Sequence, residues 1–316
     1  MKTPIITALI VSSLIAFGGP SLRAQSSTLS IKHELGTTTL FSQPKRIVVL
    51  EYSFLDALTA LGVKPIAGAI AASGGDRGVP LYLAKAAEAV ALVGSRGQPS
   101  LEAILAQKPD LILADLTRHK AIATQLEAIA PTVTWKSQDG NYDDIMTQFL
   151  EIGRIVGREA KAITLLEAQK RLVEKTRALA PKNAPFSLAA VAWAQGFTAQ
   201  SSESFTGSLL ERFGRPTIKP QAGTVRFELS LEALVAQNPE QMVLFKAPDE
   251  KILLDEWRKN PLWASLEAVK SGRIYVFDRD LWTRGKGVLA LKQMFQQAIE
   301  SGLVQNKSPS AAYQLR

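Results

Sequence analysis

Three arginines lie in loops at or near the ends of predicted strands, where side chains of α/β proteins commonly meet ligands. Arg96 lies in a Gly-Ser-Arg-Gly turn, Arg118 follows the predicted strand 110–114, and Arg284 follows the predicted strand 273–277. A guanidinium group binds a carboxylate through two parallel hydrogen bonds. This pattern predicts a clamp for an anionic ligand that is rich in carboxylate oxygens.

Five other residues could complete such a site. Arg77 and Arg226 are loop arginines with the same chemistry and weaker positional support. Trp193 closes a predicted strand and Trp282 lies in a loop, where an indole offers a flat wall and an N–H donor. Tyr52, at the end of the first strand, is a further wall candidate, although one tyrosine without a His/Asp cluster makes a poor metal site. The alternatives are solvated surface arginines and aromatic side chains packed in a core.

One segment of the chain occurs twice. Residues 100–113 and 230–244 share Ser, Leu, Glu, two Ala, Gln and Pro in register, and they start 130 positions apart. A spacing this long excludes a short-period solenoid and indicates two related α/β lobes, which usually hold a ligand in the cleft between them. The repeated acids Glu102 and Glu232 each follow a serine that can cap a helix, and they can offset the helix dipole.

Short apolar runs alternate with helical patterns along the chain, which predicts the α/β class with mainly parallel sheets. The stretch 141–157 is an amphipathic helical pattern, and helix continues over 159–180 without a Gly/Ser linker, so the lobes should be joined stiffly. A helix is also expected at 249–259. We divide the chain into a signal, an N-terminal lobe, a connecting helix, a C-terminal lobe and a tail, at 1–24, 29–140, 141–165, 166–305 and 306–316.

The N-terminus has the pattern of a cleavable secretory signal. Lys2 precedes the apolar run Ile5–Phe17, and a small-residue cleavage site ends at Ala24. The run is shorter than the roughly 20 residues that span a bilayer, so stable membrane insertion is not expected. Because the sequence has no cysteine, it offers no lipid-modified cysteine and no disulfide. These features predict a soluble protein in the periplasm of a two-membrane bacterium.

Composition and motifs argue against several classes of function. Loss of Lys2 and Arg23 with the signal lowers the formal net charge from +8 to +6, and no dense basic track suggests nucleic acid. Only two histidines are present, His33 and His119, too few for a zinc or manganese site. Nucleophile-elbow, P-loop and dinucleotide-binding glycine motifs are missing from the sequence. We therefore expect a binding protein without catalytic residues or a cofactor.

Seven motifs, in this order, resemble those of iron-siderophore periplasmic binding proteins, and most closely the ferric-dicitrate-binding subgroup. The resemblance covers nearly the whole chain after the signal. The stretches 70–92 and 194–204, which should border the cleft, depart from the pattern. The matching motifs are Pro44–Phe54, Val93–Glu102, Lys108–Ile112, Arg118–His119, Ile129–Pro131, Phe205–Ser208 and Asn260–Trp263.

The resemblance implies a class III periplasmic binding protein with a helical backbone and little hinge motion. It implies a monomer that takes an iron(III) chelate to an inner-membrane ABC permease, with the ATPase on a separate chain. Glu102 and Glu232 would dock against arginines of the permease. The arginines favour a citrate-type chelate with no direct protein–metal bond. A hydroxamate or mixed citrate–hydroxamate siderophore is the alternative, and cobalamin or haem would want a wider apolar face.

Overall fold

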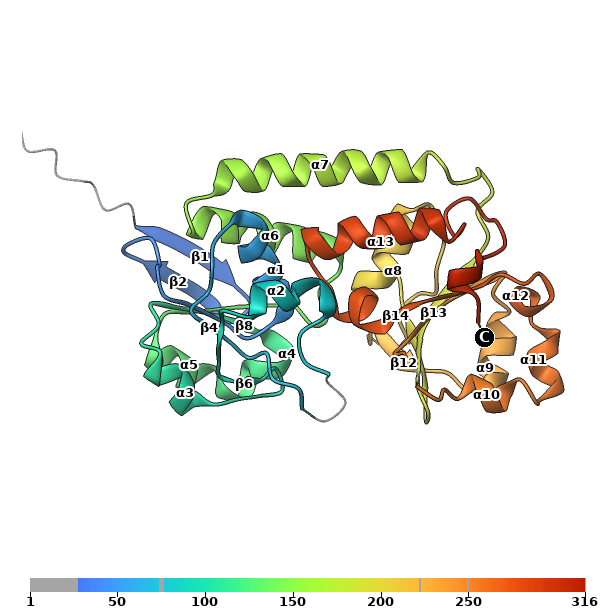
Figure 1. The fold of residues 1–316 in the computed structure, drawn as a ribbon, viewed down its shortest axis with the longest axis horizontal. Helices are drawn as coiled ribbons and strands as arrows, with labels where there is room; N and C mark the ends of the chain where they lie inside the picture. Colours follow the sequence, from blue (N-terminus) through green and yellow to red (C-terminus); the bar gives the residue numbers. More distant parts are fainter. Residues whose placement is uncertain (1–27, 74–76, 222, 249, 316) are drawn as a thin grey trace, which may run out of the picture.

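The computed structural model of the protein describes residues 28–73, 77–221, 223–248 and 250–315. Two lobes lie side by side, each built on a five-stranded sheet, and the long helix α7 (Glu159–Arg177) runs along both (Figure 1). This architecture confirms the predicted α/β class with two lobes and mainly parallel sheets. The predicted signal, residues 1–24, lies outside the described residues.

The sheet of the N-terminal lobe is parallel throughout, with the order β5–β4–β3–β8–β9. A hairpin of β1 and β2 lies against its β9 edge, where the hydroxyl of Thr38 donates a hydrogen bond to the carbonyl of Thr132. The strands are β1 (Leu29–His33), β2 (Gly36–Leu40), β3 (Ile47–Val49), β4 (Ala67–Gly68), β5 (Ala91–Leu92), β8 (Leu111–Asp115) and β9 (Thr132–Trp135).

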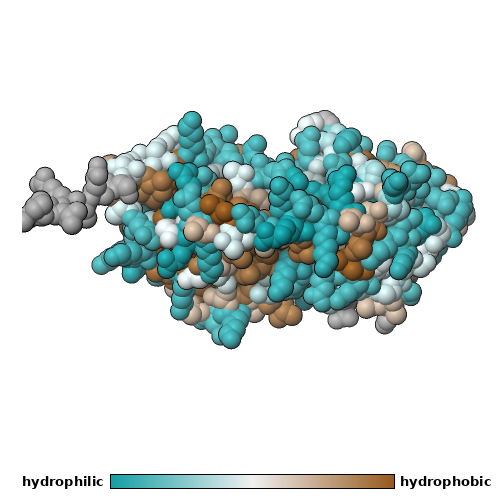
Figure 2. All heavy atoms as spheres, turned by 90° about the horizontal axis from the view of Figure 1, so that it is seen from above, coloured by the Kyte–Doolittle hydropathy of each residue, from teal (hydrophilic) through white to brown (hydrophobic). Residues whose placement is uncertain are grey.

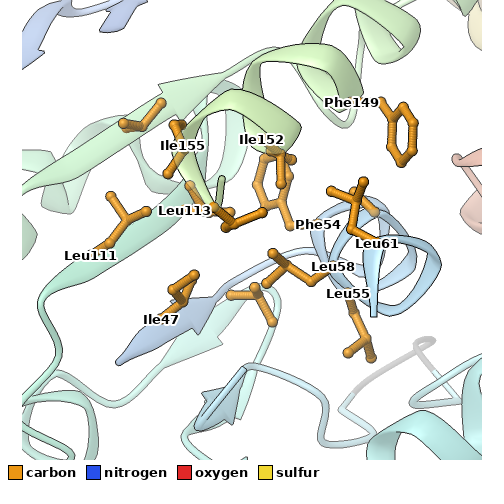
Figure 3. Packing of buried hydrophobic residues seen from close by; sticks show 14 of the residues in the cluster. Ile47, Phe54, Leu55, Leu58, Leu61, Leu111, Leu113, Phe149, Ile152 and Ile155 are labelled. Carbon is orange, nitrogen blue, oxygen red and sulfur yellow. The ribbon is translucent and has the colours of Figure 1, made fainter. Parts of the chain in front are cut away.

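Alternate side chains of these strands enter two hydrophobic layers. Ile47 and Leu111 pack with Phe54, Leu58 and Ile152 on the face covered by α1 and α6 (Figure 3). The other face packs against α3 and α5. Burial on both faces explains why the strand segments are continuous apolar runs instead of alternating ones. The helices are α1 (Tyr52–Leu61), α3 (Leu101–Ala106), α5 (Ala123–Ile129) and α6 (Tyr142–Ile155).

The C-terminal lobe repeats this layered plan with a mixed sheet of order β12–β11–β10–β13–β14. Strands β10, β13 and β14 are parallel, whereas β11 and β12 are antiparallel additions at one edge. Helices α8 (Phe205–Arg212) and α13 (Val288–Glu300) cover one face, and α9 (Leu231–Gln237) with three short helices covers the other. The strands are β10 (Ser187–Ala192), β11 (Phe197–Gln200), β12 (Arg226–Glu228), β13 (Gln241–Lys246) and β14 (Ile274–Asp278).

Some helices are shorter than the sequence suggested. Within the stretch 249–259, where a helix was expected, the described residues form only the four-residue helix α10 (Leu254–Trp257). The remaining elements are η1 (Leu81–Leu83), α2 (Ala84–Ala87), β6 (Gly94–Ser95), β7 (Gln98–Pro99), α4 (Leu116–His119), η2 (Lys120–Ile122), α8 (Phe205–Arg212), α9 (Leu231–Gln237), α10 (Leu254–Trp257), α11 (Pro261–Ser265), α12 (Glu267–Lys270), the π-helical turn η3 (Asp280–Arg284), α13 (Val288–Glu300) and η4 (Ala311–Tyr313).

The connection between the lobes is two helices, not the single helix expected over 141–165. Helix α6 ends at Ile155, and Gly157, with a φ of 63°, allows the chain to turn before α7 begins at Glu159. Gly153 lets the two helices approach closely, since a Cβ there would lie 2.5 Å from the Cβ of Ala162. Helix α7 then carries the chain into the C-terminal lobe.

A buried carboxylate joins the lobes beneath α7. Asp56 of α1 accepts hydrogen bonds from the backbone N–H groups of Leu289 and Ala290, each 3.1 Å long, at the start of α13. Gly287 is required beside it, because a Cβ there would lie 2.2 Å from the Asp56 carboxyl carbon. An anion at a helix N-terminus satisfies N–H groups that would otherwise be unpaired. The contact therefore fixes the angle between the two lobes.

The face of the protein that carries α7 is mostly hydrophilic, with apolar residues in separate patches (Figure 2). Most side chains of α7 are exposed or half-buried, and Ala162, Gln169 and Thr176 are its buried residues. Within the described ranges, no helix is both long enough and apolar enough to cross a bilayer.

Candidate ligand site between the lobes

An open cavity of about 360 Å³ lies between the lobes, where the carboxyl ends of strands from both sheets meet. Its lining carries six cationic side chains and two carboxylates. The N-terminal lobe contributes Glu51, Arg96, Arg118, Ser137, Gln138 and Asp139, and the polar residues of the C-terminal lobe include Thr198, Gln200, Arg226, Arg279, Thr283, Arg284 and Lys286.

The carboxylate of Glu51 holds two of the predicted arginines together. Glu51 follows β3 and is buried, with Oε2 3.0 Å from Nη1 of Arg96 and Oε1 2.7 Å from Nε of Arg118. The guanidinium carbon of Arg96 also lies 4.2 Å from the centre of the Tyr52 ring, in cation–π geometry. A shared carboxylate and an aromatic base therefore fix both guanidinium groups at the cavity wall.

The loops that present these groups are held by a second buried carboxylate. Asp115 closes β8, and its Oδ1 accepts a 2.8 Å hydrogen bond from the backbone N–H of Arg118. Its Oδ2 accepts hydrogen bonds from the N–H groups of Ser137 and Gln138, at 2.9 and 2.7 Å. One side chain thus ties the loop after β8 to the loop after β9, and both loops line the cavity.

His119 performs the same task for the turn that carries Arg96. The backbone N–H of Asp115 lies 2.9 Å from Nδ1 of His119, so Nδ1 accepts and Nε2 donates to the carbonyl of Arg96, also at 2.9 Å. Burial lowers the pKa of His119 below its usual value, in keeping with this neutral tautomer. His119 is therefore a positioning residue and not a metal ligand.

Two C-terminal-lobe arginines at the cavity are backed by acids of their own lobe. Nη1 of Arg279, just after β14, lies 3.0 Å from Oε2 of Glu250. Nη1 of Arg284 lies 3.3 Å from Oδ1 of Asp280, one turn earlier in η3. Both side chains are mostly shielded from solvent, so these pairs fix the guanidinium groups more firmly than surface pairs would.

Arginine contacts also cross between the lobes. Arg226 of β12 pairs with Asp139, which follows β9 in the N-terminal lobe. Arg284 donates a 3.4 Å hydrogen bond to the carbonyl of Gly78. The predicted arginines Arg96, Arg118, Arg226 and Arg284 are therefore brought together, although they come from segments far apart in the sequence.

Lys286 is the sixth cation of the cavity. Its Nζ donates to the carbonyls of Ser137, at 3.0 Å, and Gln138, so it also crosses from the C-terminal to the N-terminal lobe. The residue is 8% exposed. Burial, followed by repulsion from Arg226, lowers the pKa of Lys286 to about 7.

Only one of the two tryptophans predicted from the sequence lines the cavity. Trp193 is 42% exposed and lines the cavity, and its indole covers Gly196, where any Cβ would collide with the ring. The prediction of Trp282 as a wall is wrong. Its indole is fully buried, 4.5 Å from the Phe277 ring centre, and its Nε1 donates to Gln297. The loop expected there folds into the turn η3, which directs the indole into the core.

Tyr52 and Arg77 are not part of the cavity wall. Tyr52 is fully buried, because it begins α1 and packs in the core of its lobe beneath Arg96. Arg77 lines a separate groove with Leu81 and Asp278. The loop that carries Arg77 leads into η1, and a loop position in the sequence could not show which groove the side chain lines.

A scan against family models matches residues 47–281 to the periplasmic binding protein family. The chain belongs to this family. The Fe(3+)-citrate-binding protein YfmC of Bacillus subtilis is 35% identical over 293 residues, which cover 90% of this chain and 91% of the relative. The Fe(3+) dicitrate-binding periplasmic protein FecB of Escherichia coli is 33% identical over 271 residues, which cover 86% and 89%.

Solved structures agree with this assignment to the periplasmic binding proteins. Staphylococcus aureus SirA complexed with staphyloferrin B superposes with a TM-score of 0.74 at 25% identity, over 86% of this chain and 98% of that chain. The petrobactin-binding protein YclQ of Bacillus subtilis also gives a TM-score of 0.74, at 23% identity, over 89% and 99%. The predicted family resemblance is thereby confirmed.

In this periplasmic binding protein, the repeated acids begin equivalent helices. Glu102 and Glu232 lie exposed in the first turns of α3 and α9, whose caps Ser100 and Ser230 accept hydrogen bonds from backbone N–H groups. Hydrogen bonds from their own backbone and from those serines lower the pKa of both acids. Both helices lie on the side of the molecule opposite α7 (Figure 1). Their role in docking stays a prediction.

Sequence reasoning missed four charged groups of the cavity. Arg279 and Lys286 follow β14 as Arg284 does, Glu51 follows β3 and Asp139 follows β9. The strand-end rule applied to every charged residue would have found all four. Thr198 and Gln200 lay beyond that rule, because they come from the antiparallel strand β11.

The donor set of the cavity suits an anion and not a bare metal ion. Guanidinium and ammonium groups donate hydrogen bonds and accept none, so they match carboxylate oxygens. In the part of the chain that the structure describes, no three His, Asp or Glu side chains gather as a metal site would need. The absence of a direct bond between protein and iron stays a prediction.

Proposed function

We propose that this protein captures an anionic ferric chelate of the dicitrate type in the periplasm and delivers it, as a monomer, to an inner-membrane ABC permease. The observation that carries the proposal is the cavity, where Arg96 and Arg118 of one lobe face Arg226, Arg279 and Arg284 of the other. The names of YfmC and FecB, which bind ferric citrate or dicitrate, support the same ligand class.

The cavity has a physical reason to prefer a polyanion. Six cations and two carboxylates line it, so the ligand enters a region of excess positive charge. The arginines are held by Glu51, Asp139, Glu250 and Asp280, which limits the entropy lost when a ligand orders them. The iron remains inside the chelate, and the protein contacts the organic shell. No catalytic group and no resident cofactor takes part in this proposal.

Titration of the signal-free protein with ferric citrate, followed by tryptophan fluorescence, tests the proposal. Trp193 is half-exposed at the cavity, so a bound iron chelate should quench it. Arg118→Ala should weaken binding by about 10- to 100-fold, the loss of one charge-assisted bidentate contact. Arg171→Ala, on the exposed face of α7, is the matched control and should bind normally.

A ferric hydroxamate siderophore serves as the parallel ligand. A response to the hydroxamate with silence towards ferric citrate would keep the transport role and overturn the ligand. Silence towards both would overturn the proposal of a ferric ligand. If ferric citrate quenches the fluorescence tightly and Arg118→Ala does not change its affinity, the ligand does not bind at these arginines.

A further inference from the structure

Lys286 differs from the arginines of the cavity in its partners. Each of the five arginines has a carboxylate within 4 Å, whereas the contacts recorded for the Lys286 ammonium among the described residues are the backbone carbonyls of Ser137 and Gln138. Carbonyl dipoles stabilise a cation without cancelling its charge. Lys286 also lies in the cavity lining, where a ligand would meet it.

The charges around Lys286 leave its protonation finely balanced. Arg226 on β12 disfavours the ammonium form, while Glu51, Asp139 and Asp115, at or just after the ends of three strands of the other lobe, favour it. Burial is the largest influence, and it lowers the pKa of Lys286 to about 7. An arginine stays charged in any such setting, whereas a lysine can lose its proton.

The neutral and the protonated form of Lys286 differ in how many hydrogen bonds they can donate. A neutral amine has two N–H bonds, and both can be used by the carbonyls of Ser137 and Gln138. The ammonium form has a third N–H bond for a group in the cavity. A hydrogen bond from Lys286 to a chelate carboxylate, with both carbonyl contacts kept, therefore requires the protonated form.

We propose that Lys286 takes up a proton from solvent when an anionic chelate enters the cavity, so that chelate and proton bind together. This inference rests on the proposed function, and it deepens it by making capture depend on pH. The negative chelate favours the ammonium, and by reciprocity the ammonium raises the affinity for the chelate. No other bond changes, and the proton comes from the buffer.

The sign of the pH dependence follows from this coupling. Below about pH 7 Lys286 is already protonated, so it adds no pH dependence to binding. Above that pH the free protein has lost the proton, and the chelate must restore it. Affinity should therefore fall with rising pH above 7, by up to tenfold per pH unit, until the pKa of the complex is reached.

Calorimetry at pH 8 tests the inference directly. Ferric citrate in excess citrate is titrated into the intact signal-free protein in two buffers of different ionisation enthalpy, and the proton count per binding event is obtained. Lys286→Arg, which stays charged, should take up roughly 0.5 to 0.9 proton fewer than the wild type. Changes in chelate protonation cancel in this difference, because both titrations use the same ligand at the same pH. Lys270→Arg, exposed on α12, should give the wild-type count.

Lys286→Gln gives a second measurement that does not require an arginine to fit the buried site. The ratio of its Kd to the wild-type Kd should be large at pH 6.5 and shrink by about tenfold between pH 7 and 8.5. Equal proton counts in wild type and Lys286→Arg, or a ratio that does not change with pH, would overturn this inference and leave the proposed function standing. Absence of ferric citrate binding in wild type would overturn both.

Discussion

Glu51 is a carboxylate inside a site for anions, and its contacts explain why it is there. Arg96 and Arg118 approach the same cavity wall, and without a shared counter-charge their guanidinium groups would repel each other. Glu51 is 5% exposed, so its bonds to both arginines are only weakly screened. The residue acts on the ligand through the arginines, and we regard it as a positioning residue.

Glu51→Gln should lower the free energy of unfolding by about 2–4 kcal/mol, because it leaves two partly buried cations without their counter-charge. The protein should recover part of this loss when ferric citrate supplies carboxylates. Urea unfolding with and without the chelate measures both effects. Glu151→Gln breaks an exposed pair with Arg154 and should cost no more than about 1 kcal/mol. An equal cost for the two variants would contradict the proposed positioning role.

At the scale of single residues, the sequence predicted the chemistry of the site better than it predicted which residues line the site. Arginine at a strand end is informative because parallel strands all present their carboxyl ends at one edge. Arg96, Arg118 and Arg284 follow that rule, whereas Arg226 lines the cavity from the first residue of β12. Trp282 did not, because the direction of a side chain within a turn depends on local backbone geometry that the rule does not contain.

At the scale of elements, the packing of α6 on α7 shows what a periodic pattern cannot supply. Hydrophobic spacing predicted helix on both sides of residue 158 and a stiff connection, and both helices are present. The pattern could not show that the chain turns back after α6, so that α7 packs along α6. That turn depends on two glycines, Gly157 for its backbone angle and Gly153 for the close approach to Ala162.

Gly153→Ala should destabilise the protein by about 1–3 kcal/mol, because the added methyl group must push α6 away from α7. Ala162→Gly alone should cost about 1 kcal/mol through helix propensity. The double variant Gly153→Ala/Ala162→Gly should be more stable than the sum of the two losses predicts, because the methyl group finds room. Chemical denaturation of the four proteins gives the coupling energy. Strict additivity would show that the two residues do not limit helix packing.

At the scale of the whole molecule, Asp56 fixes one lobe on the other. Complete burial, the largest influence, raises the pKa of Asp56 to about 6, although hydrogen bonds from Leu289, Ala290 and Val288 oppose the rise. The Tyr82 side chain also contributes to this environment, and burial together with the Asp56 charge raises the pKa of Tyr82 well above its usual value. The lobe contact is therefore sensitive to mild acid.

Stability should respond to pH through this group with a definite sign. The unfolded chain binds the Asp56 proton near pH 4, and the folded protein binds it near pH 6, so the folded state holds more protons between these values. The free energy of unfolding of wild type minus that of Asp56→Asn should rise by about 2–3 kcal/mol as pH falls from 7 to 4. His119 and the other titratable groups are present in both proteins, so their contributions to the free energy of unfolding cancel in this difference.

Urea unfolding at several pH values measures this difference. Asp255→Asn, a change at an exposed aspartate, is the control and should track the wild type. A difference between wild type and Asp56→Asn that falls towards acid would mean that the helix N-terminus outweighs burial at Asp56. Ferric citrate binding by Asp56→Asn at pH 7 then shows how far the cavity depends on the fixed lobe angle.

The proposed delivery of the chelate to a permease needs a surface that spans both lobes, and the repeated acids offer one. Glu102 and Glu232 are exposed in equivalent first turns of α3 and α9, and these two helices lie on the side opposite α7 (Figure 1). The double variant Glu102→Lys/Glu232→Lys should bind ferric citrate with unchanged Kd, because neither acid lines the cavity. Uptake of iron-55 citrate into cells that carry the cognate permease should fall to the level without binding protein.

The control variant Glu167→Lys/Glu174→Lys places the same charges on α7 and should transport normally. Normal uptake by the first pair would remove these acids from the docking surface, whereas loss of chelate binding would show that the charges act on the cavity from outside it.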